Sequence, residues 1–270
     1  MRKFVAVILV SLALLLNVNY ANAATGSDKV VFDTTQINNG IIMVASNTGT
    51  DKKIKLQVVK DQEKVTYNLK DNGKMESFSL QYGNGDYKIS VLKNKEGTKY
   101  EYLATTKVSV NVNNDNSVYL GSVQNVNWNK DMTAIAKAAE LTKNAKSDED
   151  KIAAVYNYIV KNFNYDYNKL KNLKNDYLPV IDETLADKTG ICYDYSSLFA
   201  ALLRSQGIPT KLVKGYADKV NGYHAWNEVY KSDTGKWITI DTTYDSQMRA
   251  ASAKYVMEKN KAEYQTVNEY

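Results

Sequence analysis

The chain has little of the residues that build covalent or metal-bound frameworks. Among its 270 residues there are one cysteine, one histidine and two prolines. A single thiol excludes an internal disulfide framework and a cysteine-rich zinc site, and a single imidazole excludes a histidine-rich catalytic metal site. No loop carries the spaced carboxylates of an EF-hand-type calcium site. We therefore expect no metal and no other cofactor, and any chemistry must use very few groups.

The chain also lacks a large excess of charge of either sign. The formal net charge is +5, and neither half of the chain carries a basic block or stripe of the kind that binds nucleic acid. A content of 44% hydrophobic and 24% charged residues is typical of a folded globular protein, and 13 glycines without a low-complexity run leave little room for long linkers. Nucleic acid is therefore not an expected partner.

The N-terminus has the three parts of a secretory signal peptide. Residues 1–3 read Met-Arg-Lys, residues 4–16 are almost entirely apolar, and residues 21–23 read Ala-Asn-Ala. An uncleaved membrane anchor is the alternative, but the apolar run is shorter than the roughly 20 residues of a bilayer-spanning helix. We expect residues 1–23 to be cleaved after Ala23, giving a secreted protein, extracellular or at the cell surface, without a membrane span.

The remaining sequence changes character near residue 127. Short runs that alternate apolar and polar residues, separated by turn signals such as Asp71-Asn72-Gly73, predict seven strands at residues 30–32, 41–45, 54–59, 65–69, 78–82, 87–92 and 100–112. This number of strands in about 100 residues is typical of a β-sandwich. We predict an all-β, immunoglobulin-like sandwich domain over residues 24–126, acting as a structural or binding module.

Residues 127–270 form the second predicted domain, which mixes helices and strands. Ser147, followed by Asp150, resembles a helix N-cap, and apolar residues at 3–4 spacing continue this helix to Phe163. The polar, tyrosine-rich residues 164–188 are interpreted as a long loop that forms a functional rim.

Cys192 lies at the start of another helix. Gly190 precedes it, and an apolar stripe at helical spacing follows and ends at Gly207 and Pro209. Free backbone N–H groups at a helix N-terminus favour a thiolate, although Asp194 in the same turn opposes it. The structural alternative is a small buried hydrophobe, yet a lone thiol at a helix start in a secreted protein favours a reactive role.

His224 lies in one predicted strand and Asp241 ends the next. If Lys231 pairs with Lys236 across the intervening turn, then His224 and Asp241 share a face of the sheet within hydrogen-bonding reach. Each residue alone has a structural alternative, and Asp245 and Asn227 are rivals for the role of Asp241. Together, a thiol, an imidazole and a carboxylate are the parts of a nucleophile, base and orienting group.

Several motifs around these residues support the same interpretation. Gly190-Ile191-Cys192, residues 202–209 (LLRSQGIP), residues 224–229 (HAWNEV) and residues 241–244 (DTTY) closely resemble the core of the transglutaminase-like superfamily. The resemblance implies a papain-like α+β core in which Cys192 is the nucleophile, His224 the general base and acid, and Asp241 the residue that orients the imidazole. A strand-rich domain before such a core is similar to the arrangement of secreted bacterial members.

The expected activity is cysteine-dependent chemistry on amide bonds through a thioester. We favour a protease or amidase that acts on extracellular or cell-wall peptides or proteins, and acyl transfer that cross-links protein glutamine is the other branch. The expected partner is an extracellular protein or peptide substrate; no residue argues for or against association with the cell wall. A non-catalytic surface-binding protein on the same scaffold is the alternative from a different class. Candidates for the oxyanion site or the cleft walls are Tyr165, Tyr167, Tyr193 and Trp226, each of which has core packing as its alternative.

Overall fold

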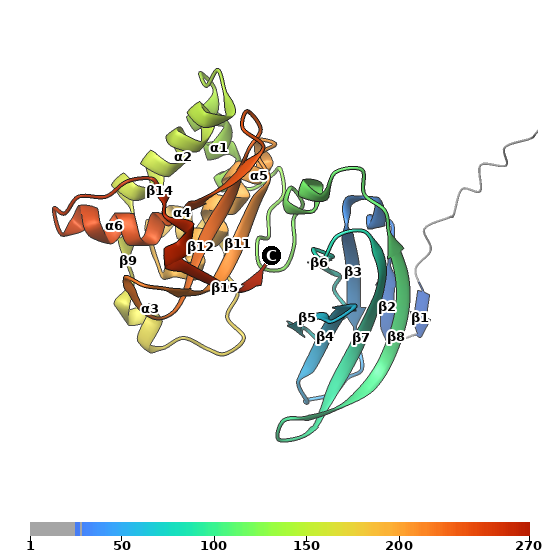
Figure 1. The fold of residues 1–270 in the computed structure, drawn as a ribbon. Helices are drawn as coiled ribbons and strands as arrows, with labels where there is room; N and C mark the ends of the chain where they lie inside the picture. Colours follow the sequence, from blue (N-terminus) through green and yellow to red (C-terminus); the bar gives the residue numbers. More distant parts are fainter. Residues whose placement is uncertain (1–24, 28) are drawn as a thin grey trace, which may run out of the picture.

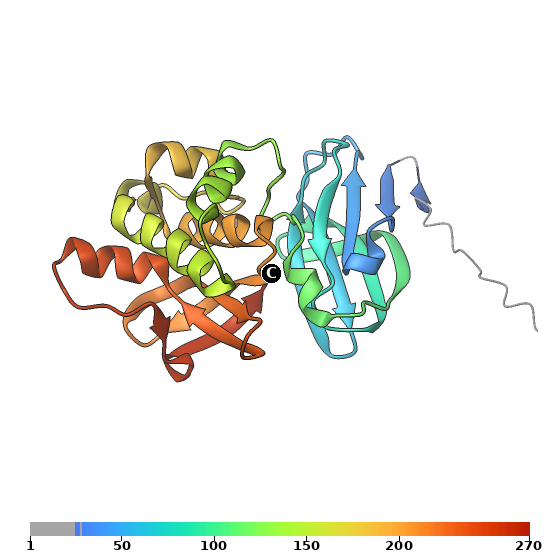
Figure 2. The same ribbon diagram turned by 90° about the horizontal axis from the view of Figure 1, so that it is seen from above.

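The computed structural model describes residues 25–27 and 29–270 and divides them between two lobes that lie side by side (Figures 1 and 2). The predicted signal peptide lies outside the described residues. Within the described part of the chain, no helix is both long enough and apolar enough to cross a membrane.

The N-terminal lobe consists of two four-stranded antiparallel sheets, with strand orders β1-β2-β3-β6 and β5-β4-β7-β8. Its strands are β1 (Thr25–Ser27), β2 (Val30–Asp33), β3 (Ile41–Ser46), β4 (Ile54–Lys60), β5 (Glu63–Leu69), β6 (Glu76–Ser79), β7 (Gly85–Glu96) and β8 (Lys99–Val110). All seven predicted strands are present, with β6 shifted towards the N-terminus, and β1 is additional. The immunoglobulin-like assignment stays a prediction.

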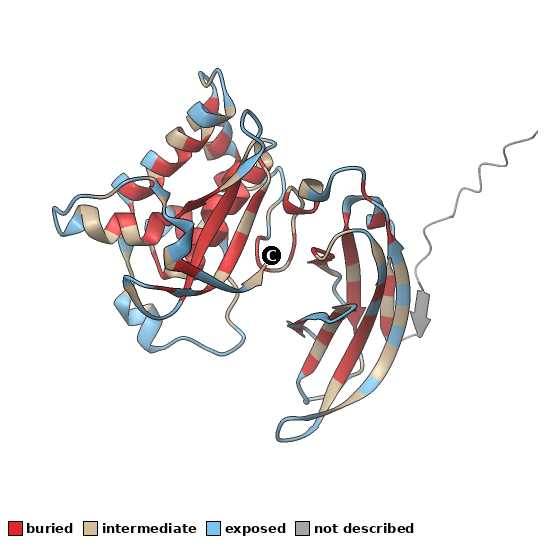
Figure 3. Cartoon of the chain, viewed as in Figure 1, coloured by how far each residue is buried: buried red, intermediate tan, exposed pale blue. Residues whose placement is uncertain are grey.

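Alternation of residue type builds the core of this lobe. In β4 the side chains of Ile54, Leu56 and Val58 are buried, whereas the residues between them are partly exposed. The same alternation occurs in β5, where Val65, Tyr67 and Leu69 are the buried residues. Figure 3 shows buried and exposed positions alternating along these strands.

The C-terminal lobe combines helices with a five-stranded antiparallel sheet of order β14-β13-β12-β11-β15. Its main elements are α1 (Thr133–Thr142), α2 (Asp148–Asn162), β9 (Asn164–Tyr165), α3 (Tyr167–Lys171), α4 (Ile181–Asp187), β10 (Thr189–Gly190), α5 (Cys192–Ser205), β11 (Thr210–Ala217), β12 (Val220–Lys231), β13 (Lys236–Ile240), α6 (Thr242–Ala250), β14 (Glu258–Lys259) and β15 (Tyr264–Glu269). Helix α5 packs against β11 and β12. The predicted mixture of helices with antiparallel strands is confirmed.

Two expectations about this lobe have different outcomes. Helix α2 begins as predicted, because the Ser147 side chain accepts a hydrogen bond from the Asp150 N–H at 3.1 Å. The prediction that residues 164–188 are a long loop is wrong, because α3, α4 and the short strand β9 lie within them. These elements are too short to give a readable period in the sequence.

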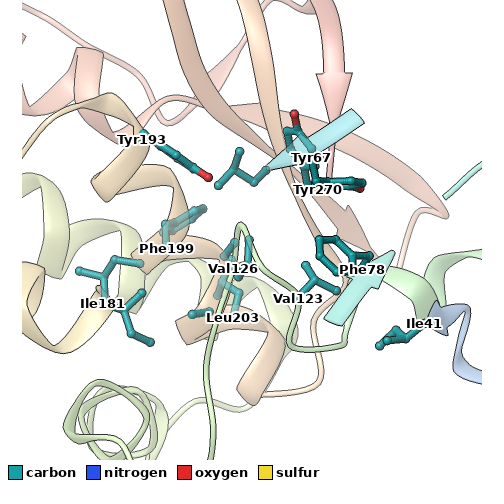
Figure 4. Packing of buried hydrophobic residues seen from close by; sticks show 14 of the residues in the cluster. Ile41, Tyr67, Phe78, Val123, Val126, Ile181, Tyr193, Phe199, Leu203 and Tyr270 are labelled. Carbon is teal, nitrogen blue, oxygen red and sulfur yellow. The ribbon is translucent and has the colours of Figure 1, made fainter. Parts of the chain in front are cut away.

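The two lobes share one buried core. The ring of Tyr67 contacts Phe78 of its own lobe and Tyr270 of the other, with centroids 4.9 and 5.7 Å apart. Figure 4 shows these rings beside Val123 and Val126 of the connecting segment. The lobes are therefore packed together through apolar contacts as well as joined by the chain.

Arg204 adds a polar connection at this junction. Its guanidinium is buried and donates to the carbonyl oxygens of Thr210, Gly121 and Tyr270 at 2.7–2.8 Å. Burial lowers the pKa of Arg204 to about 9. Because Gly121 lies between the lobes, this one side chain ties the end of α5 to the connecting segment and to the sheet.

Candidate active site

Cys192 is the first residue of α5 and is partly exposed. Most of the helix behind it is buried, including the apolar residues at 198–203. The predicted helix start is confirmed. The first backbone N–H groups of a helix have no partner within it, so the sulfur lies at the positive end of the helix dipole.

Asp194 holds this helix start in place. Its Oδ2 accepts from the Ile191 N–H at 2.8 Å and from Lys169 Nζ at 3.1 Å, and Tyr177 donates its hydroxyl to Oδ1. A Cβ at Gly190 would lie 2.6 Å from the Asp194 Cβ, which explains why glycine stands there. The buried negative charge beside the thiol is therefore compensated by a lysine from α3, a contact that the sequence did not reveal.

His224 and Asp241 meet on adjacent strands, as the turn geometry predicts. Lys231 pairs with Lys236, and the same register runs to Asn227 opposite Ile240. His224 Nε2 lies 2.8 Å from Asp241 Oδ2, and both side chains are buried. Since Nε2 is occupied, Nδ1 is the ring nitrogen left for the hydrogen bond with Cys192.

Asp241 is fixed from two further directions. Its Oδ1 caps α6 by accepting from the Tyr244 N–H at 2.9 Å, and its Oδ2 also accepts from the Tyr264 hydroxyl at 3.1 Å. Nothing in the sequence indicated that Tyr264 contacts Asp241. It comes from β15, which pairs with β11 rather than with a neighbour in sequence, so no local pattern indicates its position.

The electrostatics of His224 favour the imidazolium. Burial by itself lowers the pKa of His224, but the Asp241 charge, the Asp241 hydrogen bond and the Cys192 side chain together raise this pKa to about 10. A protonated imidazole beside the sulfur stabilises a thiolate. The arrangement can therefore hold a thiolate–imidazolium pair at neutral pH.

The two rivals of Asp241 have other partners. Asn227 donates to the carbonyl oxygens of Ser196 and Lys211, both at 3.0 Å, and so joins α5 to the sheet. Asp245 accepts from the Tyr156 hydroxyl at 2.8 Å and is paired with Lys259. Burial raises the pKa of Asp245 to about 6, against the opposing effect of Lys259. Among the three candidates, Asp241 is the one hydrogen-bonded to His224.

The two tyrosines after α2 lie at different distances from the thiol. Tyr165 pairs with Gly190 through β9 and β10, and the backbone N–H of Cys192 lies close enough to its hydroxyl to influence the pKa of Tyr165. Burial, with a further contribution from Cys192, raises the pKa of Tyr165. Tyr167 is exposed, donates to Gln247 at 3.2 Å and packs its ring against Tyr165. Tyr165 is therefore next to Cys192, whereas the exposed Tyr167 contacts Tyr165 and Gln247.

The other two aromatic candidates also differ. Tyr193 is nearly buried, accepts a hydrogen bond from Asn125 at 2.8 Å and lines a cavity between the lobes. Trp226 has no exposed surface, so the expectation that it lines the cleft is wrong. Its ring lies almost parallel to that of His224, at 6.3 Å, and also packs against Tyr264. Large aromatics in central strands usually pack in this way.

Comparison with known proteins identifies this part of the chain. The model of the transglutaminase-like superfamily matches residues 135–242, a range that contains Cys192, His224 and Asp241. Residues 135–242 are therefore similar to the transglutaminase-like superfamily. The resemblance stated from the sequence motifs is thereby confirmed.

Two curated proteins are similar to part of this chain at moderate identity. The uncharacterized YebA of Bacillus subtilis (strain 168) is 35% identical over 123 residues, and a protein-glutamine gamma-glutamyltransferase of Pseudomonas aeruginosa is 32% identical over 77 residues. These matches cover 39% and 24% of this chain but only 17% and 11% of the relatives. The periplasmic domain of TgpA from Pseudomonas aeruginosa is 15% identical, with a TM-score of 0.39 over 82% of this chain and 97% of that one.

Over residues 25–27 and 29–270, no group of three or more histidine, cysteine, aspartate or glutamate side chains could hold a metal ion.

Proposed function

We propose that this chain is a cysteine-dependent enzyme that acts on amide bonds, with Cys192 as nucleophile, His224 as general base and acid, and Asp241 as the orienting residue. The observation that carries the proposal is the 2.8 Å hydrogen bond between His224 Nε2 and Asp241 Oδ2, behind a thiol at a helix N-terminus. Transglutaminase-like proteins are generally enzymes of the cysteine protease or transglutaminase type, and residues 135–242 match their model.

The reaction proceeds through two acyl transfers. The Cys192 thiolate adds to the amide carbonyl carbon, and the carbonyl π electrons move onto oxygen to form a tetrahedral oxyanion. The oxyanion collapses, the carbon–nitrogen bond breaks, and the leaving nitrogen takes a proton from the His224 imidazolium. A thioester on Cys192 and a free amine result, and Asp241 keeps the imidazole oriented throughout.

The oxyanion needs two donors near the sulfur. The backbone N–H of Cys192 is one, and the nearby Tyr165 hydroxyl is the second that we propose. When a carbonyl oxygen enters, the Tyr165 O–H rotates to donate to it, and the Cys192 N–H donates to the same atom. Tyr167 supports the Tyr165 ring from outside.

Hydrolysis is the branch that we favour for the thioester. His224 then removes a proton from water, the hydroxide adds to the thioester carbonyl, and the Cys192 thiolate leaves. Acyl transfer to an amine is the second candidate, and the similarity to the Pseudomonas aeruginosa gamma-glutamyltransferase favours it. A glutamine-containing peptide, incubated with and without a labelled amine and analysed by mass spectrometry, distinguishes the branches. Incorporation of the amine would overturn hydrolysis, and no turnover of any amide would favour the non-catalytic binding protein.

We place this activity outside the cytoplasmic membrane. Support comes from the basic, apolar and Ala-Asn-Ala segments of residues 1–23. Expression of the full chain in a bacterial host, followed by N-terminal sequencing of the exported protein, tests this placement. A new N-terminus at Ala24 is the expected result, and a protein that keeps Met1 and stays in the membrane fraction would contradict it.

A further inference from the structure

A cavity of about 860 Å³ lies between the two lobes, next to the candidate active site. The N-terminal lobe contributes Lys55 and Tyr67 from β4 and β5, and the C-terminal lobe contributes Tyr193 and Lys214 from α5 and β11. We call it the interlobe cleft. Its volume suits a segment of several amino-acid residues. Neither lobe forms it alone.

Lysine dominates the charge of the interlobe cleft. Two aspartates, Asp71 and Asp176, face six lysines, and the lysines are Lys52, Lys53, Lys55, Lys70, Lys174 and Lys214. Asp71 is already bound to the hydroxyls of Ser46 and Thr48. In the described part of the chain, none of the six lysines forms an ion pair. Six lysines against two aspartates leave the lining with a formal net charge of +4, compared with +5 for the whole chain, and none of these lysines has an acidic partner among the described residues.

Tyr193 links the interlobe cleft to the candidate nucleophile along the chain, and Cys192 itself is not among the residues that line the cleft. Tyr193 directly follows Cys192, and the Lys214 ammonium lies 3.4 Å from the centre of the Tyr193 ring. The Lys214 charge also interacts with Cys192, while burial lowers the pKa of Lys214 to about 8. A ligand that fills the cleft therefore contacts Tyr193, the residue that directly follows the candidate nucleophile.

The wall of the cleft contains a hydrogen-bond acceptor without a partner. Asn125 donates through Nδ2 to Tyr193, whereas its buried Oδ1 accepts no hydrogen bond from any described residue. Buried acceptors are normally satisfied, and the N–H of an entering peptide group is a suitable donor. The tyrosine rings that line the cleft offer apolar contact to side chains of the same ligand.

We propose that the interlobe cleft binds an acidic segment of a peptide or protein substrate and presents the adjoining amide bond to Cys192. The inference rests on the proposed function and adds the substrate class. Lysines without an ion-pair partner attract carboxylates, and the reaction proposed for Cys192 requires an amide carbonyl. A peptide rich in aspartate and glutamate supplies both in one chain, which an anionic polysaccharide does not.

Binding is tested with full-length Cys192→Ala protein, which cannot turn the ligand over. The probe is a fluorescein-labelled peptide rich in glutamate and aspartate around one glutamine, and fluorescence anisotropy is the readout. We expect binding that weakens as salt is raised and is stronger than for a peptide with lysine in place of the acids. The double variant Lys53→Glu/Lys70→Glu, on the Cys192→Ala background, should bind the acidic peptide about tenfold more weakly.

The matched control reverses two exposed lysines of the same lobe outside the cleft, Lys64→Glu/Lys107→Glu, and should leave the affinity within about twofold. Equal losses in both double variants, or equal binding of acidic and lysine-rich peptides, would overturn the proposal. Binding of polygalacturonate in place of the peptide would also overturn it, in favour of a polysaccharide. Because binding is measured without the nucleophile, its failure is distinct from a failure of amide cleavage by the wild-type protein.

Discussion

His224 Nε2 and Asp241 Oδ2 lie 2.8 Å apart in a buried setting, and this pair connects the sheet to the start of α6. The pair fixes which ring nitrogen faces Cys192. Substitution of Asp241 by Asn keeps the size of the side chain but removes its charge. We expect Asp241→Asn to lower kcat/KM for a peptide amide by about a thousandfold. Retained activity within about tenfold would contradict the orienting role.

The same substitution should change how stability depends on pH. The pKa of His224 is raised from 6.5 to about 10 in the folded protein, so the folded state binds the proton more tightly. Its stabilising contribution is complete below pH 6.5 and is lost as the pH rises through about 10. Urea unfolding across this range should show a steeper decline in the free energy of unfolding for wild type than for Asp241→Asn. Parallel curves would contradict the raised pKa.

Tyr264 should act as a positioning residue through Asp241. Removal of its hydroxyl in Tyr264→Phe takes away the 3.1 Å hydrogen bond to Oδ2 and should reduce kcat about tenfold with little change in KM. The pKa of His224 should be lower in the same variant, and it is measured by following the NMR signals of the single imidazole against pH. Tyr216→Phe is the matched control, because Tyr216 is half exposed on neighbouring β11. If both variants behave alike, the positioning role is wrong.

Tyr165 and Tyr167 form a natural pair for testing the oxyanion site. Tyr165→Phe should lower kcat by about a hundredfold, the effect of losing one oxyanion donor, and leave the folded structure intact. Tyr167→Phe should have an effect of less than about threefold, since this hydroxyl binds Gln247 at the surface. Single-turnover acylation rates measure both. Similar losses in the two variants would show that the tyrosines support the site only by packing.

Arg204 should contribute to stability at the junction of the lobes. Replacement by Leu removes three hydrogen bonds to carbonyl oxygens, of which the Tyr270 oxygen keeps the Leu212 N–H as a donor, and should lower the free energy of unfolding by about 3 kcal/mol. Arg249→Leu, at a partly exposed site where one nitrogen donates to Phe163 and Asn164, should cost about 1 kcal/mol. Equal losses in urea unfolding would contradict the role of Arg204 in joining the lobes.

Local patterns in the sequence were sufficient for the parts of the site that depend on neighbours along the chain. The turn after Lys231 predicted the register that brings His224 to Asp241, and helical spacing predicted the start of α5 at Cys192. Long-range contacts were not predictable. Lys169 reaches Asp194 from a helix of five residues, too short for a hydrophobic period to be read.

Pairing between strands that are far apart in the sequence brings further residues to the site, and the sequence did not predict these contacts. Tyr264 reaches Asp241 because β15 pairs with β11, and the interlobe cleft depends on how two separately folded sheets meet. Lys214 lies in β11, and its position over Tyr193 follows from the packing of α5 on that strand. Such contacts are decided by tertiary packing, which a single sequence does not encode in local form.

Alkylation of Cys192 tests the central claim most directly, because this is the one thiol of the chain and every modification reports on it. The rate of reaction with iodoacetamide is measured from acid to alkaline pH by intact-protein mass spectrometry, for wild type and for His224→Ala. The account predicts rapid alkylation of wild type well below the ordinary thiol range near pH 8.5, and a return of His224→Ala to ordinary thiol behaviour. Identical profiles for the two proteins, or a thiol that stays inert in both, would contradict it.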